Sequence, residues 1–225
     1  KDMAGLLKPY AAEQLITALK AEVNIPIHLH THDTSGGQLA TLIKAAEAGV
    51  DVVDVAFGPL SGLTSQANLN TLVEMTRYTE RETGMDYEDL ERTSEYWGVV
   101  RSYYSAFDTT QKHGAADVYR HEMPGGQYTN LFQQGASLGI ADRWFEVCER
   151  YAEVNKVFGD IVKVTPSSKV VGDMALMLVS NNMHASELVE EGKEISFPQS
   201  VVDLMSGWLG QPEGGFPQEI KDKVL

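Results

Sequence analysis

Residues 25–33 have the sequence IPIHLHTHD, in which apolar and polar side chains alternate. This alternation is typical of a β-strand, and the Gly36-Gly37 pair would end it. A second segment, VDVVDVA at residues 50–56, is rich in β-branched residues and suits a buried parallel strand. Helical spacing connects the two from Gln38 to about Ala48, with Gly49 at the expected C-cap. The pattern therefore predicts an α/β fold.

Helical patterns continue on both sides of these strands. Residues 9–24 carry Pro9 near their start and apolar residues on one face, and another helix is expected near residues 68–77. Strands that alternate with helices predict a parallel sheet. Two or three such units are too few to close an eight-stranded barrel. If the fold is a TIM (β/α)8 barrel, we expect most of it to precede Lys1 in a longer polypeptide.

From about residue 85 the sequence becomes mainly helical, with breaks that contain glycine and proline. We expect residues 1–78 to form the last βα units of the barrel. Residues 79–225 are expected to form a mainly α-helical region of the same catalytic domain. The expected helices lie at 87–106, 131–139, 141–158, 170–182 and 198–208.

The composition excludes several classes of protein. The chain has 225 residues and a formal net charge of −14, from 18 Lys and Arg against 32 Asp and Glu, which argues against nucleic-acid binding. No apolar run approaches the roughly 20 residues that a membrane span needs. The single cysteine, Cys148, excludes an internal disulfide and fits a reducing compartment.

The HLHTHD segment is the strongest chemical signal in the sequence. On a strand, His28, His30 and His32 share one face, and two neighbouring imidazoles are suitable ligands for a divalent metal. His30 and His32 lie nearest the carboxyl end, where barrel active sites are built. Histidines bonded to backbone groups, without any metal, are the alternative.

Two further segments gain meaning from their context. Lys1 could be carbamylated to an anionic oxygen ligand if it ends a preceding strand. Thr165 precedes a proline and is therefore expected to be extended, and Ser167 or Ser168 could cap the helix that follows. Capping does not explain Lys169, which is unfavourable in a first helical turn and therefore favours contact with a ligand.

Together, these segments resemble the carboxyltransferase domain of the pyruvate carboxylase family. They occur in the family's order across nearly the whole chain, and their combination is specific although each one alone is weak. The segments are residues 1–9, 28–35, 61–66, 123–131 and 165–175.

The resemblance implies the second half of a barrel and a helical funnel over its mouth. It implies a divalent metal, manganese or zinc, held by carbamylated Lys1, His30 and His32. Thr165 matches the residue that carries a proton between biotin and pyruvate, and Ser168 and Lys169 match the biotin pocket. The implied reaction transfers a carboxyl group from carboxybiotin to pyruvate and gives oxaloacetate.

The resemblance also implies groups outside this chain. These are biotin on a carrier domain, a biotin carboxylase domain, and the further copies of a homotetramer. The expected location of the enzyme is the bacterial cytoplasm rather than the mitochondrial matrix. The family's aspartate ligand and its pyruvate-binding arginine are expected before Lys1, so Asp2 and Asp33 are not expected to replace them.

Other functions remain open at this point. A transcarboxylase or oxaloacetate decarboxylase subunit shares the lysine, the His-x-His motif and the Pro-Gly-Gly-Gln motif. A metal-dependent aldol-type lyase also uses His-x-His, but it has no use for the biotin-pocket residues near Thr165. A non-catalytic assembly module would need neither metal nor biotin.

Overall fold

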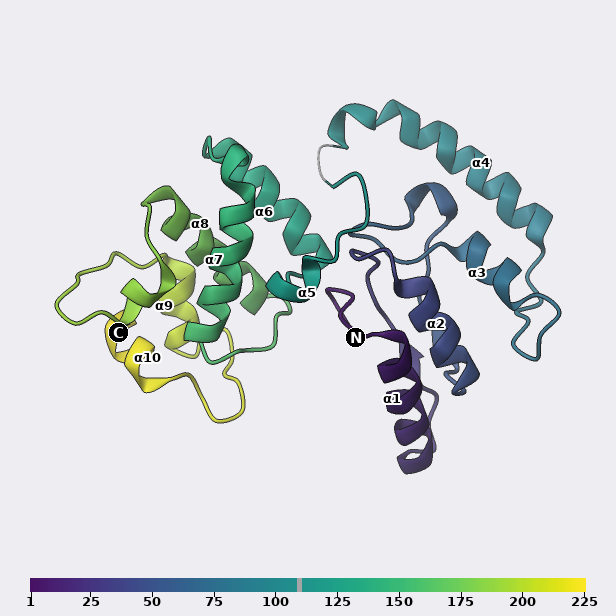
Figure 1. Ribbon diagram of the computed structural model, residues 1–225, viewed down its shortest axis with the longest axis horizontal. Helices are drawn as coiled ribbons and strands as arrows, with labels where there is room; N and C mark the ends of the chain where they lie inside the picture. Colours follow the sequence, from purple (N-terminus) through teal and green to yellow (C-terminus); the bar gives the residue numbers. More distant parts are fainter. Residues whose placement is uncertain (109–110) are drawn as a thin grey trace. The chain divides into compact units, whose positions relative to one another are not determined.

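The computed structural model describes residues 1–108 and 111–225 of the chain (Figure 1). These residues divide into two compact units, Lys1–Tyr119 and Arg120–Leu225. Within the two described ranges, every helix is too short or too polar to cross a bilayer.

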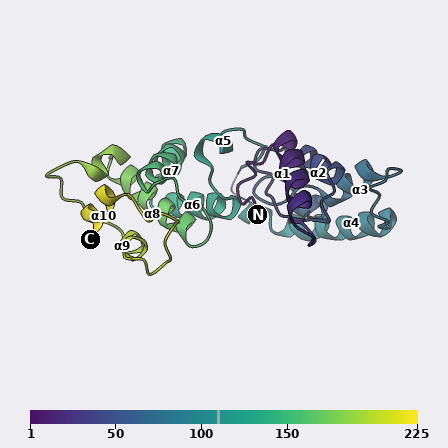
Figure 2. The ribbon, with the colours of Figure 1, turned by 90° about the horizontal axis from the view of Figure 1, so that it is seen from below.

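The first unit is a short parallel sheet covered by helices. Strands β1 and β2 pair in parallel, with His28 opposite Val52 and Leu29 opposite Val53. Helices α1 and α2 pack side by side (Figure 2), and their buried faces contribute Ile16 and Leu42 to the core. The elements are α1 (Pro9–Glu22), β1 (His28–Leu29), α2 (Gln38–Glu47), β2 (Val52–Val53), η1 (Gly58–Leu60), α3 (Leu69–Thr76), α4 (Tyr87–Tyr103) and η2 (Ser105–Phe107).

The helices predicted at 38–48 and 68–77 are confirmed, but both predicted strands are much shorter than expected. Beyond Leu29, the segment after β1 pairs instead with the first residues of the chain, which lie on its other side. Asp2 forms an isolated parallel bridge with Thr31, and the Asp2 amide donates a hydrogen bond of 2.8 Å to the His30 carbonyl. Three segments therefore run in parallel through this region, although only four of their residues count as strand.

A close backbone approach at Gly5 keeps the first residues against the histidine segment. Gly5 has φ +78°, and a β-carbon there would lie 2.0 Å from the His32 carbonyl oxygen. The Asp2 carboxylate holds this turn, since it accepts hydrogen bonds from the amides of Gly5 (2.9 Å) and Leu7 (2.7 Å). Only glycine fits this position without strain.

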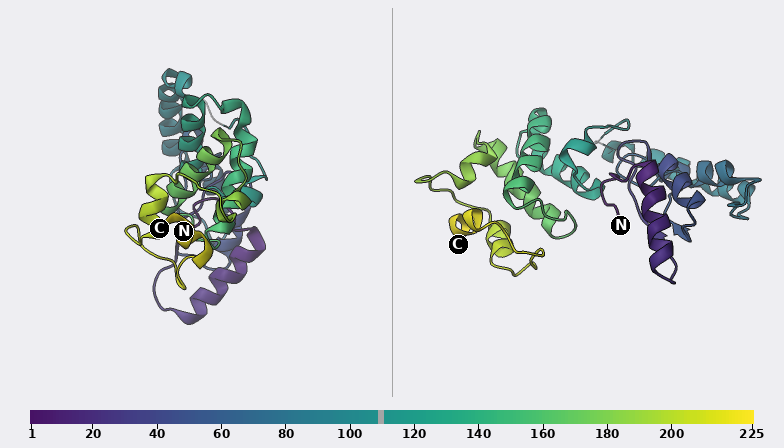
Figure 3. Two further views of the ribbon diagram at one scale, coloured as in Figure 1. Left: turned by 90° about the vertical axis from the view of Figure 1, so that its left-hand side faces the viewer. Right: turned by 60° about the horizontal axis from the view of Figure 1, so that its bottom comes forward.

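The second unit is entirely helical in its regular structure (Figure 3). Its core lies between α7 and α8 and includes the fully buried side chains of Tyr151, Phe158, Met174 and Leu178. The elements are α5 (Val118–His121), which spans the division, α6 (Gly125–Ser137), η3 (Ala141–Arg143), α7 (Trp144–Val157), α8 (Ser167–Ser180), η4 (Ala185–Val189), α9 (Gln199–Met205) and α10 (Gln218–Val224).

The compact units do not divide at residues 78 and 79, where the sequence analysis places its boundary. The first unit continues to Tyr119, because α4 packs against α3 and η1. The assignment of residues 79–225 to one helical region of the catalytic domain stays a prediction.

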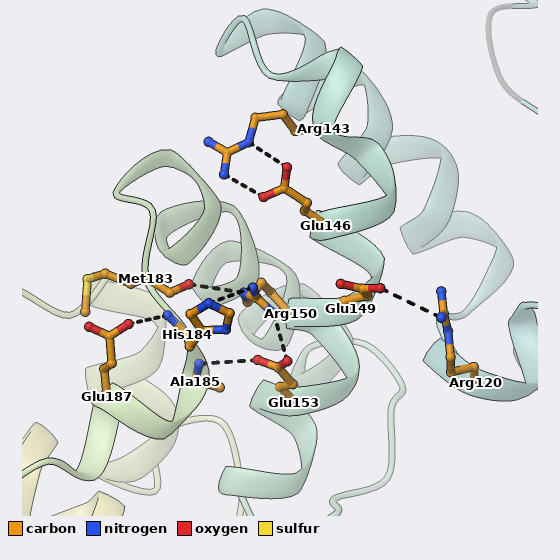
Figure 4. A network of polar contacts seen from close by, with 10 residues as sticks. All are labelled: Arg120, Arg143, Glu146, Glu149, Arg150, Glu153, Met183, His184, Ala185 and Glu187. Carbon is orange, nitrogen blue, oxygen red and sulfur yellow. Dashed lines mark hydrogen bonds and ion pairs between the residues drawn. The ribbon is translucent and has the colours of Figure 1, made fainter.

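A buried arginine ties α7 to the segment that enters η4 (Figure 4). The Arg150 side chain is only 10% exposed; its Nε donates to the Met183 carbonyl at 3.1 Å and its Nη1 to Glu153 Oε1 at 2.7 Å. The second carboxylate oxygen of Glu153 accepts the Ala185 amide at 3.4 Å. The guanidinium, itself largely buried, therefore finds a backbone carbonyl and a carboxylate as its hydrogen-bond acceptors.

Replacement of Arg150 by leucine should destabilise the second unit by about 2 kcal/mol, because it leaves the Met183 carbonyl without its side-chain donor and removes the ion pair with Glu153. Urea unfolding followed by circular dichroism measures the loss. Arg120→Leu is the matched control, since Arg120 is 59% exposed and meets Glu149 only at 3.8 Å; that pair should contribute less than about 0.5 kcal/mol. Equal stability of the Arg150 variant and the wild type would contradict the prediction.

Candidate functional site

His30 and His32 lie together just after β1, with ring centroids 5.1 Å apart and planes inclined at 76°. Each ring is held through its Nδ1 atom. His30 Nδ1 lies 2.7 Å from Asp54 Oδ2, and His32 Nδ1 lies 2.7 Å from the Thr64 carbonyl oxygen. The two rings thus have separate anchors, one on the segment after β2 and one on the loop at residues 61–66.

These anchors decide the tautomer of each ring. A carbonyl oxygen and an ionised carboxylate accept hydrogen bonds and cannot donate them, so Nδ1 carries the proton in both histidines. In a neutral imidazole with its proton on Nδ1, the Nε2 atom keeps its lone pair. A histidine whose other ring nitrogen donates to a carboxylate or a carbonyl is the usual arrangement around protein-bound metals. The pair therefore fits two ligand positions of a divalent cation.

The surroundings of His32 and Asp54 shift the pKa of each group in the direction that favours metal binding. Burial lowers the pKa of His32 and the nearby His30 ring adds to the effect, while the hydrogen bond to Thr64 opposes both. The hydrogen bonds from His28, first, and from His30 lower the pKa of Asp54. His32 is thus neutral and Asp54 ionised near neutral pH, and neutral imidazole is the form that binds metal.

The register of the first segment places Lys1 beside His30. Because Asp2 pairs with Thr31, Lys1 stands next to His30 in the parallel arrangement. The Thr31 hydroxyl donates to Asp2 Oδ2 at 3.2 Å, so these two side chains share one face. Since side chains alternate along extended chains, we expect Lys1 on the other face, with the histidines.

Asp2 and Asp33 both accept hydrogen bonds from backbone amides. Asp2 caps the turn at residues 4–7, as described above, and Asp33 Oδ1 accepts the amide of Gln38 at 2.9 Å. Burial raises the pKa of Asp33, which disfavours its ionised form. Across residues 1–108 and 111–225, no three His, Cys, Asp or Glu side chains gather as a complete metal site. Within these ranges, His30 and His32 thus lack the third side chain of these types that such a site would need.

Thr165, Ser168 and Lys169 belong to the second unit, at the start of α8. Thr165 precedes the helix and is exposed, whereas Ser168 is only 4% exposed and lies in the first turn. Lys169 is exposed and forms an ion pair with Asp173 one turn later. The Lys169 ammonium thus has a carboxylate partner on its own helix, which offsets its unfavourable position in the first turn.

The predicted serine cap of α8 is wrong. The cap position is Pro166, and it makes no side-chain cap hydrogen bond. The Ser167 hydroxyl instead faces back into the preceding loop, where it lies 2.6 Å from the Val162 carbonyl and 2.7 Å from the Val164 carbonyl. The hydroxyl shares its one proton between these carbonyls and accepts the Val164 amide at 3.2 Å, so Ser167 is bonded to the loop that carries Thr165.

Two residues that orient the histidines escaped the sequence analysis, namely Asp54 and Thr64. Asp54 had a usable signal, since it lies within the second predicted strand and shares a face with Val52, the partner of His28. Thr64 contributes only its backbone carbonyl, and no side-chain pattern reports such a contact.

Comparison with known proteins matches the chain over nearly all of its length. A family described as a conserved carboxylase domain matches residues 118–225, and an HMGL-like family matches residues 1–96. Pyruvate carboxylase of Bacillus subtilis is 52% identical, and human mitochondrial pyruvate carboxylase is 47% identical. Both matches cover the whole of this chain, which spans only 20% and 19% of those proteins, respectively.

The solved structures agree with the sequence matches. The carboxyl transferase domain of Rhizobium etli pyruvate carboxylase with pyruvate and biocytin has a TM-score of 0.97 and 53% identity, and it aligns over 99% of this chain and 38% of its own. The complete multifunctional enzyme from Rhizobium etli gives a TM-score of 0.96 over 99% of this chain and 21% of its own.

The burial of His32 predicts a low pKa in the metal-free protein, so its ring should titrate below the ordinary value of about 6.5. Since the unfolded chain then binds the proton more readily, the folded state should lose stability as the pH falls from about 6.5 through the lower folded pKa. Titration of the histidine rings by ¹⁵N NMR measures the value, with His32→Gln to assign the signal. A pKa at or above the ordinary value would contradict the prediction.

Proposed function

Since the chain belongs to the pyruvate carboxylase family, over the carboxyltransferase domain, we propose that it carries part of the site that transfers the carboxyl group of carboxybiotin to pyruvate and forms oxaloacetate. One observation supports this function above the others. The Nε2 lone pairs of His30 and His32 are free on neighbouring rings whose Nδ1 protons are already engaged.

We assign His30, His32 and Lys1 to the metal, with Lys1 as the carbamate. Carbamylation converts the Lys1 amine to an anionic oxygen ligand, and the register beside His30 supports this role. When bound, a divalent cation such as manganese or zinc would polarise the pyruvate carbonyl and stabilise charge on its oxygen. The remaining acidic ligand and the arginine that binds pyruvate are expected in the part of the barrel that precedes Lys1.

Thr165 is proposed as the residue that carries the proton between the two substrates. Decarboxylation of carboxybiotin releases CO2 and leaves a basic ureido nitrogen, which takes the hydroxyl proton of Thr165. Thr165 in turn takes a methyl proton of pyruvate, and the resulting enolate attacks CO2 to form oxaloacetate. A neutral hydroxyl suits this role because it both donates and accepts, and the exposure of Thr165 before α8 leaves it accessible.

Ser168 and Lys169 are proposed to line the biotin pocket beside Thr165. Ser168 is buried and Lys169 is paired with Asp173, so biotin would compete with Asp173 for the Lys169 ammonium. Biotin itself is expected on a carrier domain and receives its carboxyl group on a biotin carboxylase domain. We further propose the end of a (β/α)8 barrel for the first unit, a funnel for the second, a homotetramer, and the bacterial cytoplasm.

A transcarboxylase or an oxaloacetate decarboxylase subunit is the alternative within the same superfamily. Identities of 47% to 53% with pyruvate carboxylases favour the first assignment. A non-catalytic assembly module would have no need for two histidines held with free Nε2 atoms. Metal content and carboxyl transfer from carboxybiotin to pyruvate separate these functions.

The metal assignment predicts about one manganese or zinc ion per chain in the intact protein, and its loss in the His30→Ala/His32→Ala double variant. The reason is that removal of both imidazoles leaves too few ligands for tight binding. Elemental analysis after dialysis measures the content. His113→Ala is the control, since His113 is exposed and its Nδ1 lies 3.0 Å from the Gly114 carbonyl, apart from the histidine segment. Metal that survives the double substitution would overturn the assignment.

The proton-transfer role predicts that Thr165→Ala in the intact enzyme lowers oxaloacetate formation by at least about 100-fold, the usual contribution of a general acid–base residue. Metal content, folding and the ATP-dependent carboxylation of biotin should be unchanged. Thr165→Ser keeps the hydroxyl and should retain a substantial part of the activity. Comparable activity of the alanine and serine variants in a coupled malate dehydrogenase assay would refute the role.

A further inference from the structure

Asp54 contacts two histidines at once. One carboxylate oxygen, Oδ1, lies 2.7 Å from His28 Nε2, and the other, Oδ2, lies 2.7 Å from His30 Nδ1. The strand register explains this geometry. His28 pairs with Val52, so His30 and Asp54 stand two residues further along the same two neighbouring segments and on the same face.

This arrangement leaves Asp54 poorly placed to bind a metal directly. An aspartate at the end of the strand next to His30 looks like the acidic ligand that the two histidines lack. However, the histidine ring protons engage one lone pair on each of its oxygens. The carboxylate would have to give up these charge-assisted hydrogen bonds to turn toward a cation that is bound on the far, Nε2 side of His30.

The two contacts have different surroundings. The His30 side chain is 22% exposed and the His28 side chain 55%. His28 is therefore the more solvent-exposed of the two partners of Asp54. It supplies the second hydrogen bond that fixes the rotation of the carboxylate plane, while the first fixes the His30 ring.

We propose that Asp54 is a positioning residue for the metal, held by His28, which keeps the His30 ring oriented with its proton on Nδ1. The inference rests on the proposed function for the identity of the ligand His30. In this proposal His28 and Asp54 do not bind the metal themselves; they orient the histidine that does. The His32 ring has the Thr64 carbonyl in the equivalent role, so only one of the two ligands depends on a side chain.

The Asp54→Asn variant tests this role directly. An amide has one accepting oxygen and one donating NH2 group, so it cannot accept from both histidines. Where the NH2 group faces His30, Nδ1 must become the acceptor and the proton moves to Nε2, which blocks the ligand atom. The dissociation constant for Zn²⁺ or Mn²⁺ should rise by about 10- to 100-fold, as is typical when a partner of a metal ligand is lost.

The affinities are measured on the intact protein by competition with a chelator, and the ligands by X-ray absorption of the zinc-loaded form. Asp51→Asn is the matched control: Asp51 lies three residues earlier and bonds Lys20 and the Ile27 amide but no histidine, so its affinity should equal that of the wild type. Asp54→Glu should recover part of the affinity. An unchanged affinity in Asp54→Asn, or the loss of an oxygen ligand from its zinc spectrum, would overturn the proposal.

A second readout separates this inference from the proposed function. ¹⁵N NMR of the metal-free protein reports the tautomer of His30 without any bound ion. The wild type should hold the proton on Nδ1, and Asp54→Asn should shift population to the Nε2 tautomer. If the wild type binds no metal, the proposed function fails while this test still stands; if the tautomer does not change, the positioning role fails even in a metal-binding protein.

Discussion

The parallel register between β1 and β2 is the constraint on which the candidate site depends. Because side chains alternate along extended chains, pairing His28 with Val52 places His30 opposite Asp54. A shift of one residue in the β2 segment would turn Asp54 to the other face, while His30 kept its own, and would separate the pair. On the other side of this segment, the parallel bridge between Asp2 and Thr31 sets the register in the same way and brings Lys1 beside His30.

In the second unit, helix packing rather than strand pairing positions the candidate functional residues. Its core fixes α7 against α8, and the loop before α8 is held by the contacts of the Ser167 hydroxyl with the carbonyls of that loop. Thr165 therefore lies on a loop between packed helices, whereas His30 and His32 follow a strand that pairs with its neighbours. Loops carried on a rigid scaffold are a common place for catalytic groups.

Much of the local structure could be predicted from the sequence. Periodic apolar spacing located α2 and α3 to within two residues, since such segments bury one face whatever their neighbours are. The strand lengths could not be predicted, because pairing ends where the neighbouring segment leaves, as it does after Leu29. The serine cap of α8 failed for a related reason: the Ser167 hydroxyl finds carbonyl partners in the loop before the helix.

The sequence by itself determined the α/β character of the first unit, the helical character of the second, and the choice of His30 and His32 as candidate ligands. Residue types and their spacing carry that information locally. Only the tertiary structure decided which ring nitrogen of each histidine is free, because Asp54 and the Thr64 carbonyl come from segments more than twenty residues away. It also decided that Asp2 and Asp33 are engaged by backbone amides. Hydrogen-bond partners are set by packing between segments, and no local pattern specifies them.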